Sequence, residues 1–368
     1  MRDPFDEMYK KYFDELLDIF PQKFLDFNAV ADLKIVYTAM HGVGYPFVKR
    51  AFEVSKLQPV HAVIEQRDPD PEFPTVKFPN PEEGKSCLLL SMKLADNVGS
   101  DLILANDPDA DRLACAERDT RTGQWRVFNG NELGSLLGWW SVQYFKEKNP
   151  GADLSKCYVL ASTVSSKMLG SMSRIEGFNF EETLTGFKWM GNRGVELMEA
   201  GKEILFAFEE AIGFMFSPAV LDKDGVSASA HLATMASFLK VNKKMSLSEK
   251  LDELYKTYGY HYSLNSYFLC YEPKKIEKIF ERMRNWNEKS GTYPKFVLDG
   301  KYRIKNIRDL TTGVDTSTAD GKSTLPSSKS SQMITFTLEN GTVITLRTSG
   351  TEPKIKYYSE YCATPDER

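Results

Sequence analysis

The 368-residue chain is poor in cysteine, has no large excess of either charge and contains no long apolar run. Its five cysteines are widely spaced and form no CxxC pair, which argues against a disulfide framework and against a thiolate metal site. The net charge of −4 and the lack of a dense basic stretch argue against nucleic acid and membrane surfaces as partners. The N-terminal segment is charged throughout, so it is neither a signal peptide nor a membrane span. These absences favour a cytoplasmic protein of two or three domains with a small-molecule ligand.

The pattern along the chain is typical of the α/β class. After an amphipathic helix that ends at Pro21, buried strands alternate with helices, and the strand 101–106 and the strand 204–210 each run directly into a polar loop. Boundaries are expected near residue 150 and near residues 260–265. The remainder contains a helix, three strands and a long loop rich in serine and threonine.

The first polar loop is DPDADR, residues 107–112. Asp107, Asp109 and Asp111 alternate along it, so three carboxylates can converge on one hard cation such as Mg²⁺ or Ca²⁺. An EF-hand would need glycine and glutamate where this chain has Arg112 and Arg118, so that interpretation fails. Arg112 could pair with a phosphate on the same cation. An acidic surface loop with solvated charges is the alternative.

Two further loops favour a sugar ligand. Glu209 and Glu210 follow a buried strand, and carboxylates in a turn suit vicinal hydroxyl groups, although acids at a helix N-terminus are equally common. Upstream, a glycine turn, an aromatic side chain and one cation occur together at Thr185, Gly186 and Lys188. Alone, this second group is also typical of a core tryptophan beside a solvated charge.

A last motif, RTSGTEPKIK, surrounds a turn between two predicted strands. Its glycine, hydroxyl groups and guanidinium suit the binding of a phosphate that does not react, whereas an ordinary polar hairpin is the alternative. The candidate residues are Arg347, Ser349, Gly350, Thr351 and Lys356.

These motifs occur in the order and approximate spacing found in the α-D-phosphohexomutase superfamily, and the chain resembles that family from about Lys34 onward. The sequences FAFEEAIG and TGFKWMGNRG most resemble those of the branch that contains phosphopentomutases, with glucose-1,6-bisphosphate synthases as close kin. The resemblance implies a cytoplasmic, monomeric phosphosugar mutase that uses Mg²⁺ and a sugar bisphosphate such as glucose 1,6-bisphosphate.

By the same resemblance, Asp107, Asp109 and Asp111 hold Mg²⁺ and Arg112 helps to neutralise a phosphoserine. The sugar hydroxyls are read by Glu209 with Glu210 beside it. The remaining substrate contacts are implied for Thr185, Gly186, Lys188, Arg347, Ser349, Gly350, Thr351 and Lys356.

Two departures from the family pattern stand out. Ala211 replaces a serine that many relatives carry, which favours a pentose over a strict hexose preference. No segment of the TASHNP kind, which carries the phosphoserine in the family, is found; TAMH at 38–41 has Met40 in the serine's place.

We therefore expect domains 2–4 of the phosphohexomutase fold, that is, two mixed α/β sandwich domains and a smaller α+β domain, without turnover by this chain alone. The expected ranges are 1–30 (an N-terminal helix, remnant of the first domain), 31–150 (metal binding), 151–262 (sugar binding) and 263–368 (phosphate binding).

Two other functions remain open at this stage. One is a non-catalytic protein that binds or senses phosphosugars with the same loops. The other is a calcium-binding interaction module, which the failed EF-hand spacing disfavours.

Overall fold

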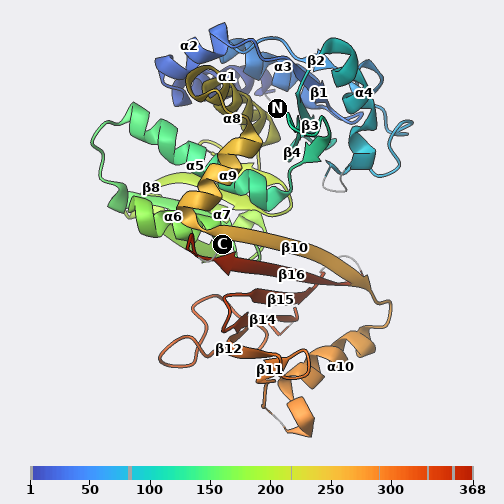
Figure 1. Cartoon of the computed structure of the whole chain (residues 1–368), viewed down its shortest axis with the longest axis vertical. Helices are drawn as coiled ribbons and strands as arrows, with labels where there is room; N and C mark the ends of the chain where they lie inside the picture. Colours follow the sequence, from blue (N-terminus) through green and yellow to red (C-terminus); the bar gives the residue numbers. More distant parts are fainter. Residues whose placement is uncertain are drawn as a thin grey trace. The chain divides into compact units, whose positions relative to one another are not determined.

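The computed structural model describes residues 3–81, 85–216, 218–289, 291–329, 331–349 and 353–366. The chain divides into two compact units, Met1–Leu254 (unit 1) and Tyr255–Arg368 (unit 2), which are described separately. Figure 1 shows the elements of each unit.

The N-terminal segment forms two helices, α1 (Phe5–Ile19) and α2 (Gln22–Val30), rather than one helix over residues 1–30. The break falls at Pro21, because proline lacks a backbone N–H and is tolerated only at a helix start. Phe13 and Leu16 of α1 are buried, which confirms the predicted amphipathic helix. The Tyr12 hydroxyl donates to Asp224 Oδ2 at 2.7 Å and so fastens α1 to the rest of unit 1.

The first sheet of unit 1 has the strand order β2-β1-β3-β4-β5. Strands β2, β1 and β3 are parallel, β4 is antiparallel to β3, and β5 is antiparallel to β4. The bounds are β1 (Ile35–Thr38), β2 (His61–Ala62), β3 (Leu102–Asn106), β4 (Leu113–Arg118) and β5 (Trp125–Val127), with helices α3 (Gly44–Val54) and α4 (Leu89–Val98). Strand β2 is short, because the chain turns into a 3₁₀ helix at Ile64–Gln66.

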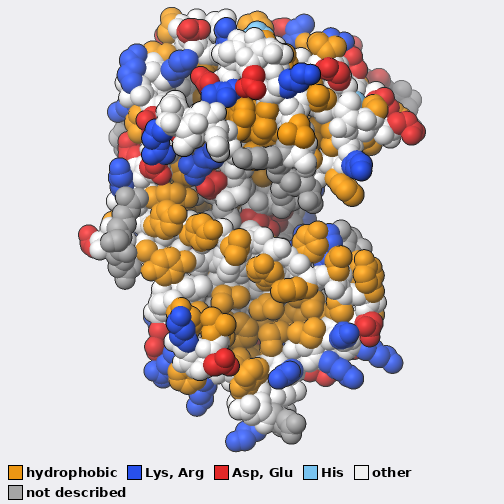
Figure 2. All heavy atoms as spheres, turned by 45° about the vertical axis from the view of Figure 1, so that its right-hand side comes forward, with side chains coloured by type: hydrophobic (Ala, Val, Ile, Leu, Met, Phe, Trp, Pro, Cys, Tyr) orange, Lys and Arg blue, Asp and Glu red, His pale blue; other side chains and the backbone are white. Residues whose placement is uncertain are grey.

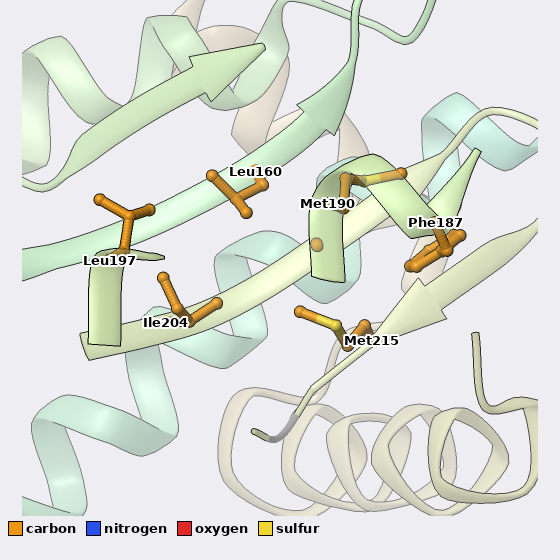
Figure 3. Close-up of a cluster of buried hydrophobic side chains, with 7 residues drawn as sticks. Leu160, Phe187, Met190, Leu197, Ile204 and Met215 are labelled. Atoms are coloured by element: carbon orange, nitrogen blue, oxygen red, sulfur yellow. The ribbon is translucent and has the colours of Figure 1, made fainter. Parts of the chain in front are cut away.

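The second sheet of unit 1 has the order β7-β6-β8-β9, in which only β9 is antiparallel. Its strands are β6 (Cys157–Ser162), β7 (Asn179–Thr183), β8 (Glu203–Glu209) and β9 (Gly213–Met215), with helices α5 (Gly130–Lys148), α6 (Met168–Glu176) and α7 (Phe187–Glu199). Figure 3 shows the core between α7 and this sheet, where Met190 and Leu197 face Leu160, Ile204 and Met215. This core fixes the start of α7 close to the ends of the strands.

Helix α8 (Gly225–Phe238) crosses between the two sheet systems. It contacts α2 and α3 of the first and β9 and α5 of the second. Thirteen of its residues, from Gly225 to Ser237, are buried, so it is buried on all sides rather than amphipathic. The helix α9 (Leu247–Tyr258) follows, and its first amides, at Leu247 and Ser248, both donate to the carboxylate of Glu117 at 2.8 Å.

Unit 2 is an antiparallel sheet of seven strands with the main order β10-β16-β15-β14-β12-β11. The strands are β10 (Tyr260–Leu269), β11 (Phe296–Val297), β12 (Tyr302–Asp309), β13 (Val314–Asp315), β14 (Met333–Leu338), β15 (Val343–Thr348) and β16 (Lys354–Ala363). Helix α10 (Pro273–Arg284) packs its buried Phe280 against Ile334, Phe336 and Ile355. Residues 260–265, where the sequence pattern placed a boundary, lie within β10.

Apolar side chains also remain exposed on unit 2, and Figure 2 shows hydrophobic side chains on the surface of the molecule. Those of β10 and the turn that follows it include Tyr262, Leu264, Phe268, Leu269 and Tyr271. Burial in unit 2 is therefore concentrated where α10 covers the sheet. No helix in the described part of the chain is both long and apolar enough to span a membrane.

Candidate functional site

The DPDADR loop, here called the metal loop (residues 107–112), begins where the buried parallel strand β3 ends. Asn106 closes the base of the loop, because its amide donates to the carbonyl oxygen of Arg112 at 2.5 Å and its Oδ1 accepts from Tyr37 at 2.8 Å. The amide of Ala110 donates to the Asp107 carbonyl at 2.9 Å, and Ala110 has a φ of 60°. The loop is thus a tight turn at the carboxyl edge of the sheet, where α/β proteins bind ligands.

The three aspartates of the metal loop converge as predicted. Asp107, Asp109 and Asp111 each offer a carboxylate oxygen, and these oxygens lie within 4.8 Å of one another. Asp111 Oδ1 is buried and has no hydrogen-bond partner among the described residues. Burial and the charge of Asp111 raise the pKa of Asp107 to about 6, against the hydrogen bond from the Arg112 amide. Asp107 is buried, Asp111 is partly buried and Asp109 is exposed, and such a cluster of carboxylate oxygens fits a hard divalent cation such as Mg²⁺.

Two cations border the aspartates. The Arg112 Nε lies 3.5 Å from Asp107 Oδ2 and 3.7 Å from Asp111 Oδ1. Lys223, which the sequence analysis did not select, places its Nζ 2.7 Å from Asp111 Oδ2. Burial lowers the pKa of Lys223, but the hydrogen bond and charge of Asp111 outweigh burial and leave the pKa above its ordinary value. The site therefore offers two positive charges beside the predicted metal ligands.

The segment Glu209–Gly213, here called the sugar loop, connects β8 to β9. Glu209 Oε1 accepts from the amide of Gly186 at 2.5 Å. Gly186 has a φ of 101°, a conformation that L side chains rarely adopt, and it caps α7. The structure therefore brings Glu209 to the turn at 185–186. Lys188, in the first turn of α7, is exposed, and its Nζ lies 5.8 Å from the ring centre of Trp189.

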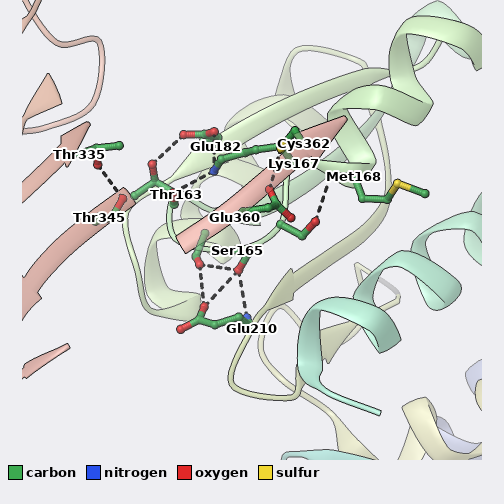
Figure 4. Close-up of polar contacts among 12 residues, drawn as sticks. Thr163, Ser165, Lys167, Met168, Glu182, Glu210, Thr335, Thr345, Glu360 and Cys362 are labelled. Atoms are coloured by element: carbon green, nitrogen blue, oxygen red, sulfur yellow. Dashed lines mark hydrogen bonds and ion pairs between the residues drawn. The ribbon is translucent and has the colours of Figure 1, made fainter. Parts of the chain in front are cut away.

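Glu210 points elsewhere. Its Oε2 accepts from the hydroxyl groups of Ser162 and Ser165, each at 3.2 Å, and its own amide donates to Ser165 Oγ at 3.0 Å (Figure 4). Burial and the charge of Glu209 raise the pKa of Glu210. The two neighbouring acids of the sugar loop thus face different partners.

The metal loop and the sugar loop are joined through their backbones. Arg112 and Gly213 form an antiparallel bridge, and the Leu113 amide donates to the Ile212 carbonyl at 3.1 Å. The amide of Gly225, at the start of α8, donates to the Ala110 carbonyl at 3.1 Å. Consequently the end of the metal loop and the sugar loop form one structure within unit 1.

The predicted phosphate residues belong to unit 2. Arg347 on β15 lies directly opposite Lys356 on β16, so their side chains share a face of the sheet. The Ser349 amide donates to the Lys354 carbonyl at 3.0 Å, which closes the turn. Gly350 and Thr351 lie outside the described residues. The structure thus brings Arg347, Ser349 and Lys356 together at one end of a β-hairpin.

Comparison with known proteins identifies the family. Residues 10–123 match the model for phosphoglucomutase/phosphomannomutase alpha/beta/alpha domain II, and residues 129–258 match the model for domain III. The chain therefore belongs to the phosphoglucomutase/phosphomannomutase family, as the resemblance predicted, and it has that family's mixed α/β fold.

Individual relatives narrow the comparison. The chain is 58% identical over 339 residues to human "Phosphopentomutase", covering 92% of this chain and 55% of the relative. It is 53% identical over 367 residues to human "Glucose 1,6-bisphosphate synthase", covering 100% of this chain and 58% of the relative. The chain thus spans a little over half the length of these relatives. A phosphoglucomutase structure from Paramecium, at 20% identity and a TM-score of 0.65, covers 96% of this chain and 57% of its own and shows the same fold.

The two matched regions divide between residues 123 and 129, before α5, whereas the sequence pattern placed a boundary at residue 150. The physical reason is that α5 packs on β8 and α6 of the second sheet. The first match also includes residues 10–30, which the sequence analysis set apart as a remnant of another domain.

Proposed function

We propose that this chain binds Mg²⁺ and a sugar phosphate and serves an intramolecular phosphotransferase reaction. The reaction interconverts ribose 1-phosphate and ribose 5-phosphate, glucose 1-phosphate and glucose 6-phosphate, or both pairs. The observation that carries the proposal is the backbone junction of the metal loop with the sugar loop, at Arg112 and Gly213. It holds a cluster of carboxylates and two cations next to a carboxylate that suits hydroxyl groups.

In this proposal Asp107, Asp109 and Asp111 would hold Mg²⁺, which when bound supplies charge neutralisation for a phosphoryl group. Arg112 and Lys223 add positive charge on the same side of the metal loop. Phosphoryl transfer depends mainly on positioning and charge stabilisation, and these residues provide both.

The sugar and the second phosphate have separate partners. Glu209 accepts hydrogen bonds from sugar hydroxyl groups, and its contact with Gly186 keeps its carboxylate at the turn that precedes α7. The turn and the first turn of α7 contribute Thr185, Gly186 and Lys188. The distal phosphate is assigned to Arg347, Ser349, Gly350, Thr351 and Lys356.

Ribose phosphates are the favoured substrates, since Ala211 offers no hydroxyl group in the sugar loop. Glucose 1,6-bisphosphate is the proposed activator or intermediate, in line with the relative named for its synthesis. We further propose that the protein acts as a monomer in the cytoplasm.

Calorimetry and a turnover assay test this function. The purified chain is titrated with Mg²⁺, ribose 5-phosphate and glucose 1,6-bisphosphate, and D109N serves as the matched variant for the metal. Binding of Mg²⁺ that D109N weakens, together with binding of ribose 5-phosphate, is the expected result. Failure of the wild-type chain to bind any sugar phosphate would refute the proposal.

We expect no conversion of ribose 1-phosphate to ribose 5-phosphate by the chain alone, because its sequence has no segment of the family's phosphoserine kind. A second candidate function is a non-catalytic protein that binds or senses phosphosugars with the same loops. This alternative is supported if the chain binds ribose 5-phosphate with micromolar affinity but converts no ribose 1-phosphate. The chain should also leave the turnover of an added phosphoserine-containing relative without any contribution of its own. Turnover by the purified chain contradicts both the expectation and the alternative.

A further inference from the structure

Glu210 lies beside Glu209, yet the structure gives it the surroundings of an interior group. Its carboxylate oxygen Oε2 receives two serine hydroxyl groups, and both serines are buried: Ser162 is fully inaccessible and Ser165 is 2% exposed. The serines come from the end of β6 and the turn after it, so the contact joins neighbouring strand ends (Figure 4). Oε2 therefore faces protein hydroxyl groups rather than solvent.

The number of protons in this cluster bears on the protonation of Glu210. Ser162 Oγ and Ser165 Oγ lie 2.7 Å apart, and each is 3.2 Å from Glu210 Oε2. Two hydroxyl protons can serve only two of these three contacts at once. A proton on Oε2 would supply the third, because Oε2 could then donate to one serine, that serine to the other, and the second serine back to Oε2; the neutral acid satisfies all three contacts, whereas the carboxylate satisfies two.

The backbone of Glu210 is held as firmly as its side chain. Its amide donates to Ser165 Oγ at 3.0 Å. On its other side Gly130, the first residue of α5, is so close that a Cβ built on it would lie 1.8 Å from the Glu210 carbonyl oxygen. Ser166 is fixed in turn, because its amide donates to Asn131 Oδ1 of α5 at 2.8 Å. The start of the sugar loop is therefore fixed between α5 and the turn after β6.

We infer that Glu210 is a positioning residue and not a substrate ligand. Held by Ser162 and Ser165, it fixes the sugar loop so that Glu209 is directed to the Gly186 amide and to the sugar. This inference rests on the proposed function for its effect on sugar affinity, but the effect on the Gly186 amide needs no ligand. Burial also keeps both serines from acting as phosphoryl acceptors, since a nucleophile must reach its substrate.

The first test compares the two acids by calorimetry with ribose 5-phosphate. E209Q and E210A should each weaken binding by about tenfold, whereas E210Q, which preserves shape and is neutral, should remain within about threefold of wild type. Mg²⁺ affinity serves as the control and should change less than twofold. An E210Q variant that loses as much affinity as E209Q overturns the inference, because it identifies Glu210 as a ligand. No binding by the wild-type chain overturns the proposed function instead.

The second test uses hydrogen exchange in the ligand-free protein and S165A, with S162A as a second variant if S165A fails to fold. Exchange at the Gly186 amide, which Glu209 protects, should accelerate about tenfold, and S165T should restore most of the protection. The amide of Leu136 in the middle of α5 should stay unchanged. Unchanged exchange at Gly186 in a folded serine variant refutes the positioning role even if no sugar binds.

Discussion

Replacement of His231 by phenylalanine should remove a large part of the acid sensitivity of unit 1. His231 lies on the fully buried helix α8 and stacks on Phe216 with ring centres 3.8 Å apart and an angle of 6° between the rings. Phe20 and Tyr144 complete its aromatic surroundings. Neither ring nitrogen has a hydrogen-bond partner among the described residues. The folded protein therefore holds a neutral imidazole with no favourable place for a second proton.

The magnitude follows from linkage. Burial lowers the pKa of His231 to about 3, whereas a histidine in the unfolded chain titrates near its ordinary value of about 6.5. Below pH 6.5 the unfolded state binds the proton and the folded state does not, so the free energy of unfolding falls as the pH falls. Each pH unit between about 6.5 and 3 costs close to 1.4 kcal/mol, which amounts to about 2 kcal/mol between pH 7 and pH 5.

Urea denaturation of wild type and H231F at pH 8, 7, 6 and 5 measures this effect. The difference in free energy of unfolding between the two proteins should change by about 2 kcal/mol between pH 7 and 5 in favour of the variant. Any packing cost of the larger ring is the same at every pH and cancels. A difference that stays constant to within about 0.5 kcal/mol would show that His231 is solvated or paired, and the burial argument would be wrong.

Three further perturbations test other parts of the structure. G130A places a methyl group 1.8 Å from a carbonyl oxygen of the sugar loop and should weaken ribose 5-phosphate binding about tenfold by calorimetry; unchanged affinity would mean that the loop moves freely. K223M removes the ammonium that competes with a metal for Asp111, so Mg²⁺ should bind about two- to fivefold more tightly, and weaker binding would contradict the competition. R284M removes the guanidinium that binds both oxygens of the buried Asp309 carboxylate. The free energy of unfolding of unit 2 should fall by about 3–5 kcal/mol in a denaturant titration, whereas a fall below about 1 kcal/mol would indicate that solvent reaches the carboxylate.

Local patterns in the sequence predict much of the fold. The strands at residues 101–106 and 204–210 are buried and apolar, and they occur as β3 and β8 with polar loops at their carboxyl ends. Strand β7 was missed because four of its five residues are only partly buried, so NFEET carries no apolar pattern. Its place is fixed by pairing with β6, which is a tertiary effect.

The candidate site likewise has some features that the local sequence predicts and others that only the folded chain creates. The convergence of Asp107 and Asp111 follows from alternation in an extended loop, which is local information. Lys223 could not be selected, since its partner lies far away in sequence and only the folded chain brings α8 to the metal loop. The one local signal was the cap sequence Asp224–Gly225 directly after it. The role of Glu210 was likewise hidden, because the serines that bind it come from another strand.

Helix α8 has a consequence for how the chain can be divided. Its sequence falls in the second matched region, yet it packs against α2 and α3 of the first, and Asn28 of α2 donates to its Thr234 at 2.9 Å. If the gene were divided between residues 123 and 129, the first product would lack α8, on which its α2 and α3 pack. The second product would expose the surface of α8 that α2 and α3 cover in the whole chain. The two matched regions are thus not exchangeable modules, because α8 packs on elements of both.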